Sequence, residues 1–393
     1  MDFRMLNFFN KRKKRKFLSE LRARRHADDD LLTPAQKEEF DGVIAAFAGS
    51  DPKDFKNAAA AALERSGRIV PPYTWIRNLL DLLIVVGAVA FGIRGLFFQP
   101  FKIPTGSMQP TLYGIHFMES TPLGKNLPGF LNYALFSARR ARLEVKDSGE
   151  VKFLKYNNSL FFDNVTFSIG GKVYALPGAP QKVMEYSGLE EGLHCRAGEV
   201  RTDGFLSMGD HLFVERFSIY LKEPQRGEVM IFTTDDLTVG GEPLSASSGF
   251  YYVKRLVALP GDTVRLKENQ LYVKPAGREA FVKIRELAPR TEKLYSGKGG
   301  YQGHLSTMGD YRLFGAEEDY IVPPDHYFML GDNSAFSLDS RFFGAVPRRN
   351  LVGRSWFIFW PFSRRWGSTD RLPPLDFPTG SPVRGTFPVM YKQ

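Results

Sequence analysis

The sequence predicts a mainly β domain that follows a single membrane-spanning helix, with a helical region in front of that helix. Three observations predict this arrangement. Short apolar runs separated by Gly, Pro and Asp fill the chain after Pro100, the segment Leu79–Phe98 is long and apolar, and residues 1–70 contain helix-favouring stretches. With 393 residues, 43% of them hydrophobic, the chain can form two or three domains with buried cores.

Residues 1–78 are predicted to form a basic cytoplasmic region. Thr33 is placed as the N-cap of a helix, and the stretch Ala58–Arg65 is rich in alanine. The unbroken basic run Lys11–Lys16 indicates contact with acidic lipid headgroups or with nucleic acid. Because an apolar span follows within 70 residues, we favour lipid and expect no nucleic-acid partner.

The segment Leu79–Phe98 is predicted to be a transmembrane anchor. Its 20 residues would form a helix about 30 Å long, which matches the hydrocarbon core of a bilayer. A start at residue 79 is too late for a cleavable signal peptide, and the alternative is a buried core helix. Basic residues precede the segment closely and only Lys102 follows it, so we expect the N-terminus in the cytoplasm and everything after Phe98 outside.

The exported part divides by composition into core segments and two additions. The core segments are 99–113, 206–274 and 321–393, residues 114–205 read as an inserted β-rich module, and residues 275–320 form a Gly-rich excursion. The predicted strands include Leu212–Phe217, Glu228–Thr233, Tyr251–Ala258, Thr263–Lys267 and Val165–Ile169. The aromatic stretch Trp356–Phe362 is either a membrane-contacting surface or a core strand, and both interpretations stay open.

Cysteine and histidine usage argues against disulfide and metal chemistry. The single cysteine, Cys195, excludes an internal disulfide and a Cys-rich zinc motif. The six histidines are scattered without metal-ligand spacing. We therefore expect no cofactor.

Ser107 and Lys254 are the candidate nucleophile and base. A serine hydroxyl attacks a carbonyl only when a base removes its proton, and a lysine can do this only while its amine is neutral. Its ordinary pKa must therefore fall by about two units, which burial can cause. The alternation of a strand puts Lys254 on an apolar face with Tyr252 and Leu256, whereas Arg255 points the other way. An ordinary edge-strand lysine and a Ser–His pair through His116 or His211 are the alternatives.

Two further groups of polar residues support this pair. Thr105 lies two residues before Ser107 and can add a hydroxyl donor for an oxyanion. The polar loop Gly331–Gly344 offers a hydroxyl that could orient the amine of Lys254. Its carboxylates are expected to pair with arginines and hold the site rigid, in the combinations of Asp332 and Asp339 with Arg255 and Arg341.

Taken together, these stretches resemble the bacterial type I signal peptidases. The matching stretches are Gln99–Leu112, Gly209–Phe217, Arg226–Val229, Tyr252–Asp262, Gly331–Pro347 and Asn350–Arg354. The resemblance implies that Ser107 is the nucleophile, that Lys254 is the general base and that Ser337 positions Lys254. It also implies an oxyanion held by the amide of Ser107 and the hydroxyl of Thr105. Shallow pockets for small substrate side chains would be lined by Ile103, Met108, Leu112, Tyr252 and Val253.

The same resemblance implies a signal-peptidase-like β fold, a location in the bacterial inner membrane and removal of signal peptides from exported preproteins through an acyl-enzyme. Its expected partners are these preproteins, the lipid bilayer and, in function, the secretion translocon. The triplet Ser334–Phe336 replaces the Arg-Asp-Asn usual in the family, and the insertion 114–205 is larger than expected. The alternatives are a self-cleaving LexA-like repressor, which the anchor disfavours, and a catalytically silent membrane protein that binds exported chains or assembles complexes.

Overall fold

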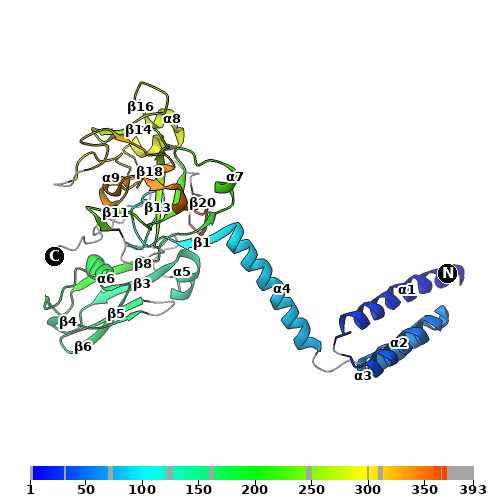
Figure 1. Cartoon of the computed structure of the whole chain (residues 1–393). Helices are drawn as coiled ribbons and strands as arrows, with labels where there is room; N and C mark the ends of the chain where they lie inside the picture. Colours follow the sequence, from blue (N-terminus) through cyan, green and yellow to red (C-terminus); the bar gives the residue numbers. More distant parts are fainter. Residues whose placement is uncertain are drawn as a thin grey trace. The chain divides into compact units, whose positions relative to one another are not determined.

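The computed structural model divides the chain into two compact units, Met1–Gly92 and Ile93–Gln393, and each is described by itself (Figure 1). The structure describes residues 3–30, 32–69, 74–119, 121, 127–158, 163–244, 250–298, 301–308, 313–363 and 365–369. The end of the predicted last core segment, 370–393, therefore lies outside the described residues.

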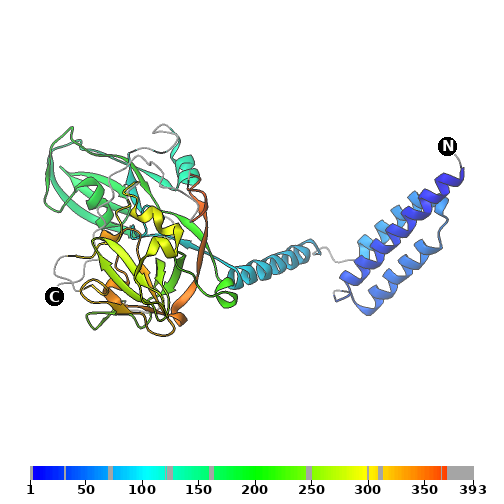
Figure 2. The same ribbon diagram turned by 90° about the horizontal axis from the view of Figure 1, so that it is seen from above.

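Three packed helices precede the apolar helix in the first unit, which confirms the predicted helical N-terminal region (Figure 2). They are α1 (Phe3–Ala27), α2 (Pro34–Gly49) and α3 (Phe55–Ile69), with the 3-10 turn η1 (Pro52–Asp54) before α3. Thr33 is the N-cap of α2, as predicted: its hydroxyl accepts from the Gln36 amide, and its own amide donates to the Gln36 side chain. Phe40 and Phe47 of α2 bury their rings against Leu21 of α1 and Ala62 of α3.

The apolar helix α4 (Thr74–Leu96) contains the window Asn78–Gly95, the one stretch of helix in the described ranges that is long and apolar enough to cross a membrane. None of that window is buried inside the protein, so α4 is not a core helix. The helix begins and ends earlier than the predicted 79–98. Phe98 already belongs to a strand, because its backbone pairs with Glu215.

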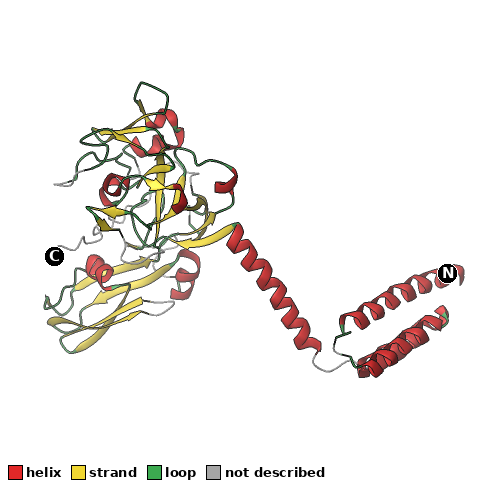
Figure 3. Cartoon of the chain, in the orientation of Figure 1, coloured by secondary structure: helices red, strands yellow, loops and turns green. Residues whose placement is uncertain are grey.

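An eight-stranded antiparallel sheet forms the centre of the second unit and gives it the predicted mainly β character (Figure 3). Its strands follow the spatial order β1 (Phe98–Lys102), β9 (His211–Glu215), β20 (Leu351–Trp360), β10 (Val229–Thr233), β13 (Tyr251–Ala258), β18 (His326–Leu330) and β19 (Val346–Pro347), with β21 (Gly367–Ser368) paired to β20. The stretch Trp356–Phe362 therefore lies largely in strand β20, although the side chains of Trp356 and Phe362 are exposed.

The Gly-rich excursion contributes strands to a second sheet. This sheet contains β14 (Thr263–Lys267), β15 (Gln270–Lys274), β16 (Val282–Lys283) and β17 (Tyr320–Ile321). Its inner residues Val264 and Val273 share one hydrophobic cluster with Val257 of β13 and Leu330 of β18. Strand β13 is thus covered on both faces, because Leu256 belongs to a different cluster from Val257.

The insertion folds into two sheets with a core of its own. One sheet contains β2 (His116–Met118), β8 (Val200–Ser207) and β3 (Ala138–Glu144); the other contains β6 (Lys172–Pro177), β5 (Asp163–Ile169), β4 (Gly149–Asn158) and β7 (His194–Cys195). Two helices accompany them, α5 (Gly129–Phe136) and α6 (Pro180–Ser187). Val151, Phe167 and Cys195 are buried in this core.

Short elements complete the second unit. They are α7 (Ser218–Leu221), β11 (Thr238–Val239), β12 (Glu242–Pro243), α8 (Ile284–Leu287), η2 (Pro289–Tyr295), η3 (Ser334–Phe336), α9 (Ser340–Phe343) and η4 (Arg348–Asn350). Of these, η3 and α9 belong to the polar loop that follows β18.

Candidate active site

Ser107 and Lys254 lie in hydrogen-bond contact although 147 residues separate them in the sequence. The Lys254 amine donates to the Ser107 hydroxyl with an Nζ–Oγ distance of 2.7 Å. Ser107 lies in the loop after β1, and Lys254 lies in the middle of β13. A nucleophile and a base at this separation can exchange a proton directly.

The Lys254 side chain is almost removed from water, with a relative exposure of 3%. This burial lowers the pKa of Lys254 to about 8, and the charge of Asp339 offsets only part of the effect. The ring of Tyr252, on the same face of the strand, has its centroid 5.1 Å from the amine. Near neutral pH a useful fraction of the amine is therefore unprotonated.

Two buried ion pairs lie next to the pair of Ser107 and Lys254, and they join the four residues that the sequence suggested, without a prediction of which carboxylate pairs with which arginine. Arg255 donates to both carboxylate oxygens of Asp332, at 2.8 and 2.6 Å. Arg341 donates to both carboxylate oxygens of Asp339, at 2.8 and 3.0 Å. All four side chains are completely buried. Burial acts to raise the pKa of each carboxyl, but the paired guanidinium outweighs burial and holds the pKa below its ordinary value.

Ser337 lies in the same loop, and its hydroxyl is buried. Within the described part of the chain this hydroxyl forms no hydrogen bond to Lys254; it interacts with Asp339, where it helps to lower the pKa of the carboxyl. Thr105 is exposed, and its hydroxyl oxygen lies 3.5 Å from that of Ser107.

The predicted substrate-contacting residues fall into two groups. Ile103, Met108 and Leu112 are core side chains, at most 3% exposed, and they pack with the half-buried Val253. Tyr252 belongs to a neighbouring cluster. Of the five residues, Tyr252 and Val253 are half-buried and therefore more accessible than Ile103, Met108 and Leu112, which are buried.

Sequence reasoning missed several residues that support the site. Thr111 donates to the Asp332 carboxylate and bonds to the Tyr301 hydroxyl, with an oxygen–oxygen distance of 2.7 Å for the second contact. Asn333 bonds to the nucleophile loop. Tyr301 belongs to the Gly-rich excursion, whose composition gave no sign that it approaches the loops of the site.

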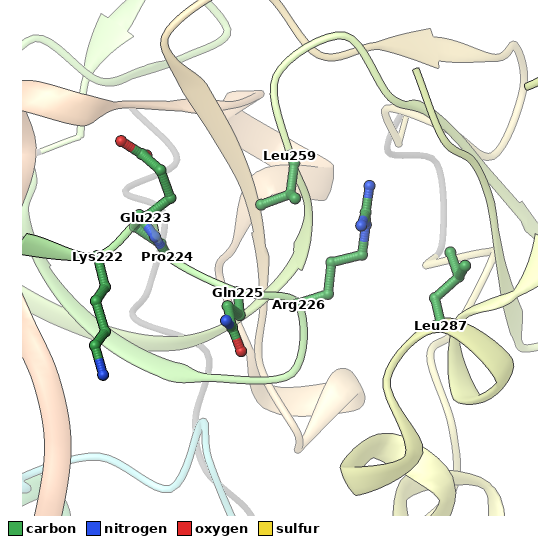
Figure 4. Close-up of a pocket in the computed structure, with 7 residues that line it drawn as sticks. All are labelled: Lys222, Glu223, Pro224, Gln225, Arg226, Leu259 and Leu287. Atoms are coloured by element: carbon green, nitrogen blue, oxygen red, sulfur yellow. The ribbon is translucent and has the colours of Figure 1, made fainter. Parts of the chain in front are cut away.

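A pocket of about 460 Å³ lies elsewhere in the same unit (Figure 4). Its lining consists of Lys222, Glu223, Pro224, Gln225, Arg226, Leu259 and Leu287, none of which is a candidate site residue. Arg226 points its guanidinium at Asp262, with nitrogen–oxygen distances from 2.6 to 3.0 Å. The pocket is therefore separate from the pair of Ser107 and Lys254.

If the pair of Ser107 and Lys254 cleaves peptides, as the sequence resemblance implies, replacement of Gly331 by alanine should lower kcat/KM by about a hundredfold, because misplacing reacting groups by about 1 Å has this effect. A Cβ atom at this position would lie 2.0 Å from Ser337 Oγ and 2.7 Å from Ser107 O. The measurement is peptide cleavage, with Gly42→Ala as the control, since a Cβ there meets nothing within 4 Å. Unchanged cleavage by the Gly331 variant would contradict the close packing of the two loops.

Comparison with known proteins finds a family model and several relatives similar to this chain. Residues 203–360 match the family model described as signal peptidase, peptidase S26. The matched part contains Lys254 and the loop with Asp332 and Asp339, whereas Ser107 precedes it.

Several curated proteins are similar to this chain. Signal peptidase I of Bacillus licheniformis is 33% identical over 162 residues, which cover 41% of this chain and 73% of that protein. Signal peptidase I of Pseudomonas aeruginosa is 35% identical over 186 residues, covering 40% of this chain and 61% of that protein. A probable signal peptidase I-2 of Synechocystis is 31% identical over 159 residues, covering 40% and 59%. The chain thus spans about three fifths of the length of the last two relatives.

Proposed function

This chain belongs to the signal peptidase I family, peptidase S26, and on that premise we propose that it is a membrane-anchored endopeptidase that removes signal peptides from exported preproteins. The observation that carries the proposal is the 2.7 Å contact between the buried Lys254 amine and the Ser107 hydroxyl. The neutral amine is the general base, and Ser107 is the nucleophile.

The proposed reaction has two halves. Lys254 takes the proton of Ser107 as Oγ attacks the peptide carbonyl, and the oxyanion accepts hydrogen bonds from the Ser107 amide and the Thr105 hydroxyl. The protonated amine then gives its proton to the leaving nitrogen, which releases the mature chain and leaves an acyl-enzyme on Ser107. Lys254 next deprotonates a water molecule, which attacks the ester; the C–Oγ bond breaks, the signal peptide leaves with a new carboxyl group, and Lys254 returns the proton to Ser107 Oγ.

The ion pairs of Arg255 with Asp332 and of Arg341 with Asp339 hold the two loops around the base. We assign Ser337 to orienting the Lys254 amine, because a hydroxyl that donates to Asp339 keeps two lone pairs with which it can accept from the amine. We assign Ile103, Met108 and Leu112, which are at most 3% exposed, to the closed wall of the substrate pocket that the family resemblance implies. This favours cleavage after small residues, since a large side chain would overlap these core residues.

Cleavage of a preprotein with alanine before the cut tests the proposal, with the purified chain compared with its Ser107→Ala variant. We expect cleavage by the wild type and only background cleavage by the variant. Equal activity in both would reject Ser107 as nucleophile. Binding of the preprotein by both without any cleavage would favour the catalytically silent membrane protein.

The pH dependence of cleavage follows from the base. Because burial lowers the pKa of Lys254 to about 8 and the neutral form is the active one, kcat/KM should rise with pH through 8 and level off above it. About a tenth of the amine is neutral at pH 7 on this basis. Rates measured from pH 6 to 10 check this, and a profile that falls across the same range would contradict a lysine base.

We further propose that α4 spans the bacterial inner membrane once, with α1 to α3 in the cytoplasm and the β domain outside. On α1, Arg12, Lys13, Arg15 and Lys16 are exposed, whereas Lys14 donates to the Ala48 carbonyl at 2.7 Å. Arg65 and Arg68 of α3, within about ten residues of the start of α4, are exposed as well, and cations this close to a span favour the cytoplasmic side. The exposed cations of α1 can contact the anionic lipids of that side. Protease added to spheroplasts should digest the β domain and spare residues 3–69, and the reverse pattern would overturn this orientation.

A further inference from the structure

We propose that Asn333 is a positioning residue that aims the backbone amide of Ser107 at the oxyanion, an inference that rests on the proposed function. Two hydrogen bonds join Asn333 to the nucleophile loop. Its side-chain amide donates to the Gly106 carbonyl with an Nδ2–O distance of 2.9 Å. Its backbone amide donates to the Ser107 carbonyl with an N–O distance of 3.0 Å.

These two bonds hold the peptide groups on both sides of Ser107. The C=O and N–H of a trans peptide lie in one plane and point in opposite directions. The Gly106–Ser107 bond is trans, so the bond to the Gly106 carbonyl fixes the direction of the Ser107 N–H. The bond to the Ser107 carbonyl fixes the next peptide plane, and together the two bonds set both backbone torsions of the nucleophile.

Asn333 is itself well held. The preceding residue, Asp332, is completely buried and receives both bonds from Arg255. The Asn333 carbonyl accepts from the amide of Phe336 at 3.0 Å, within the 3-10 turn η3. An oxyanion donor requires such rigid support, because its N–H must already point at the substrate carbonyl oxygen before negative charge develops on that oxygen.

The amide side chain is chemically specific for this task. A carbonyl oxygen only accepts hydrogen bonds, so the nitrogen of the Asn333 side chain must face Gly106. Asn333→Asp keeps the size and removes the donor, and Asn333→Ala removes the group. Loss of an oxyanion donor itself lowers kcat by about 10²- to 10³-fold. A misaimed donor should have less effect, so we expect kcat to fall about 10- to 100-fold in both variants with KM within twofold.

Asn350 provides the matched control. Its side-chain amide also donates to backbone carbonyls of the same unit, those of Thr233 at 3.0 Å and Asp235 at 2.7 Å, and it is 3% exposed. Asn350→Ala should lower the unfolding temperature and leave kcat unchanged. A fall in kcat with constant KM in the Asn333 variants alone separates positioning from general support of the fold.

The experiment measures kcat and KM for preprotein cleavage by the full chain, together with binding of a peptide boronic acid, which forms a tetrahedral adduct with serine. We expect boronate affinity in the Asn333 variants to fall by the same factor as kcat/KM. Unchanged kcat in both variants, or equal effects in the Asn350 control, would overturn the inference. Activity of Ser107→Ala in the same assay reports separately on the proposed function.

Discussion

Replacement of Lys254 by methionine is expected to lower kcat by about 10²- to 10⁴-fold, the range that a positioned general base contributes. Methionine fills a similar volume, but it cannot accept the proton of Ser107, whose oxygen lies 2.7 Å from the lysine amine. KM should change little, because the amine acts on the nucleophile. Single-turnover cleavage of a preprotein measures the loss.

Lys222→Met is the matched control for this variant. Lys222 is an exposed lysine of the same unit that lines the separate pocket, and its removal should leave cleavage unchanged. Retention of more than about a tenth of wild-type kcat by the Lys254 variant would be inconsistent with the general-base contribution expected here.

The Lys254→Met substitution should also change how the free energy of unfolding depends on pH. Because burial lowers the pKa of Lys254 from 10.5 to about 8, the unfolded chain keeps a proton between these two pH values that the folded chain has released. Wild-type stability should therefore rise with pH across this window, by of the order of 3 kcal/mol in total, and that rise is absent in the methionine variant. Unfolding of both proteins by urea at pH 7 and pH 10.5 measures the difference.

The strand and helix patterns of the sequence were sufficient to predict which segments form the main strands and the apolar helix. The bounds of Tyr251–Ala258 and Thr263–Lys267 were predicted as the structure has them, because apolar runs bounded by turn residues such as Pro, Gly, Asp and Asn define such strands locally. The end of α4 was not predicted correctly. Phe98 was assigned to the helix, but it lies in a strand because it pairs with Glu215, far along the chain. Local hydrophobicity does not contain such a long-range partner.

The burial of Lys254 could be predicted from the local sequence, whereas the burial of its neighbour Arg255 could not. Period-two alternation placed Lys254 on an apolar face, and the side chain is buried. The opposite face was not predicted to be buried as well, yet Arg255 is completely buried, because the second sheet covers that side of β13. Tyr301 approaches the site through folding of the excursion, which composition cannot reveal.

The second large effect is expected for Asp339→Asn, which should lower the free energy of unfolding by about 3 to 5 kcal/mol, because it leaves the buried Arg341 charge without its counter-ion. Asp319→Asn is the control: Asp319 receives two bonds of 2.7 Å from Arg265, the same bidentate geometry, but the two side chains are 39% and 45% exposed. Water replaces the partner of an exposed charge, so this control should change stability little.

The Asp339→Asn variant should also change the pH profile of cleavage. Since the charge of Asp339 raises the pKa of Lys254, its loss should move the rise of kcat/KM to lower pH. Equal urea midpoints for the two variants would contradict the buried pair as a support of the base.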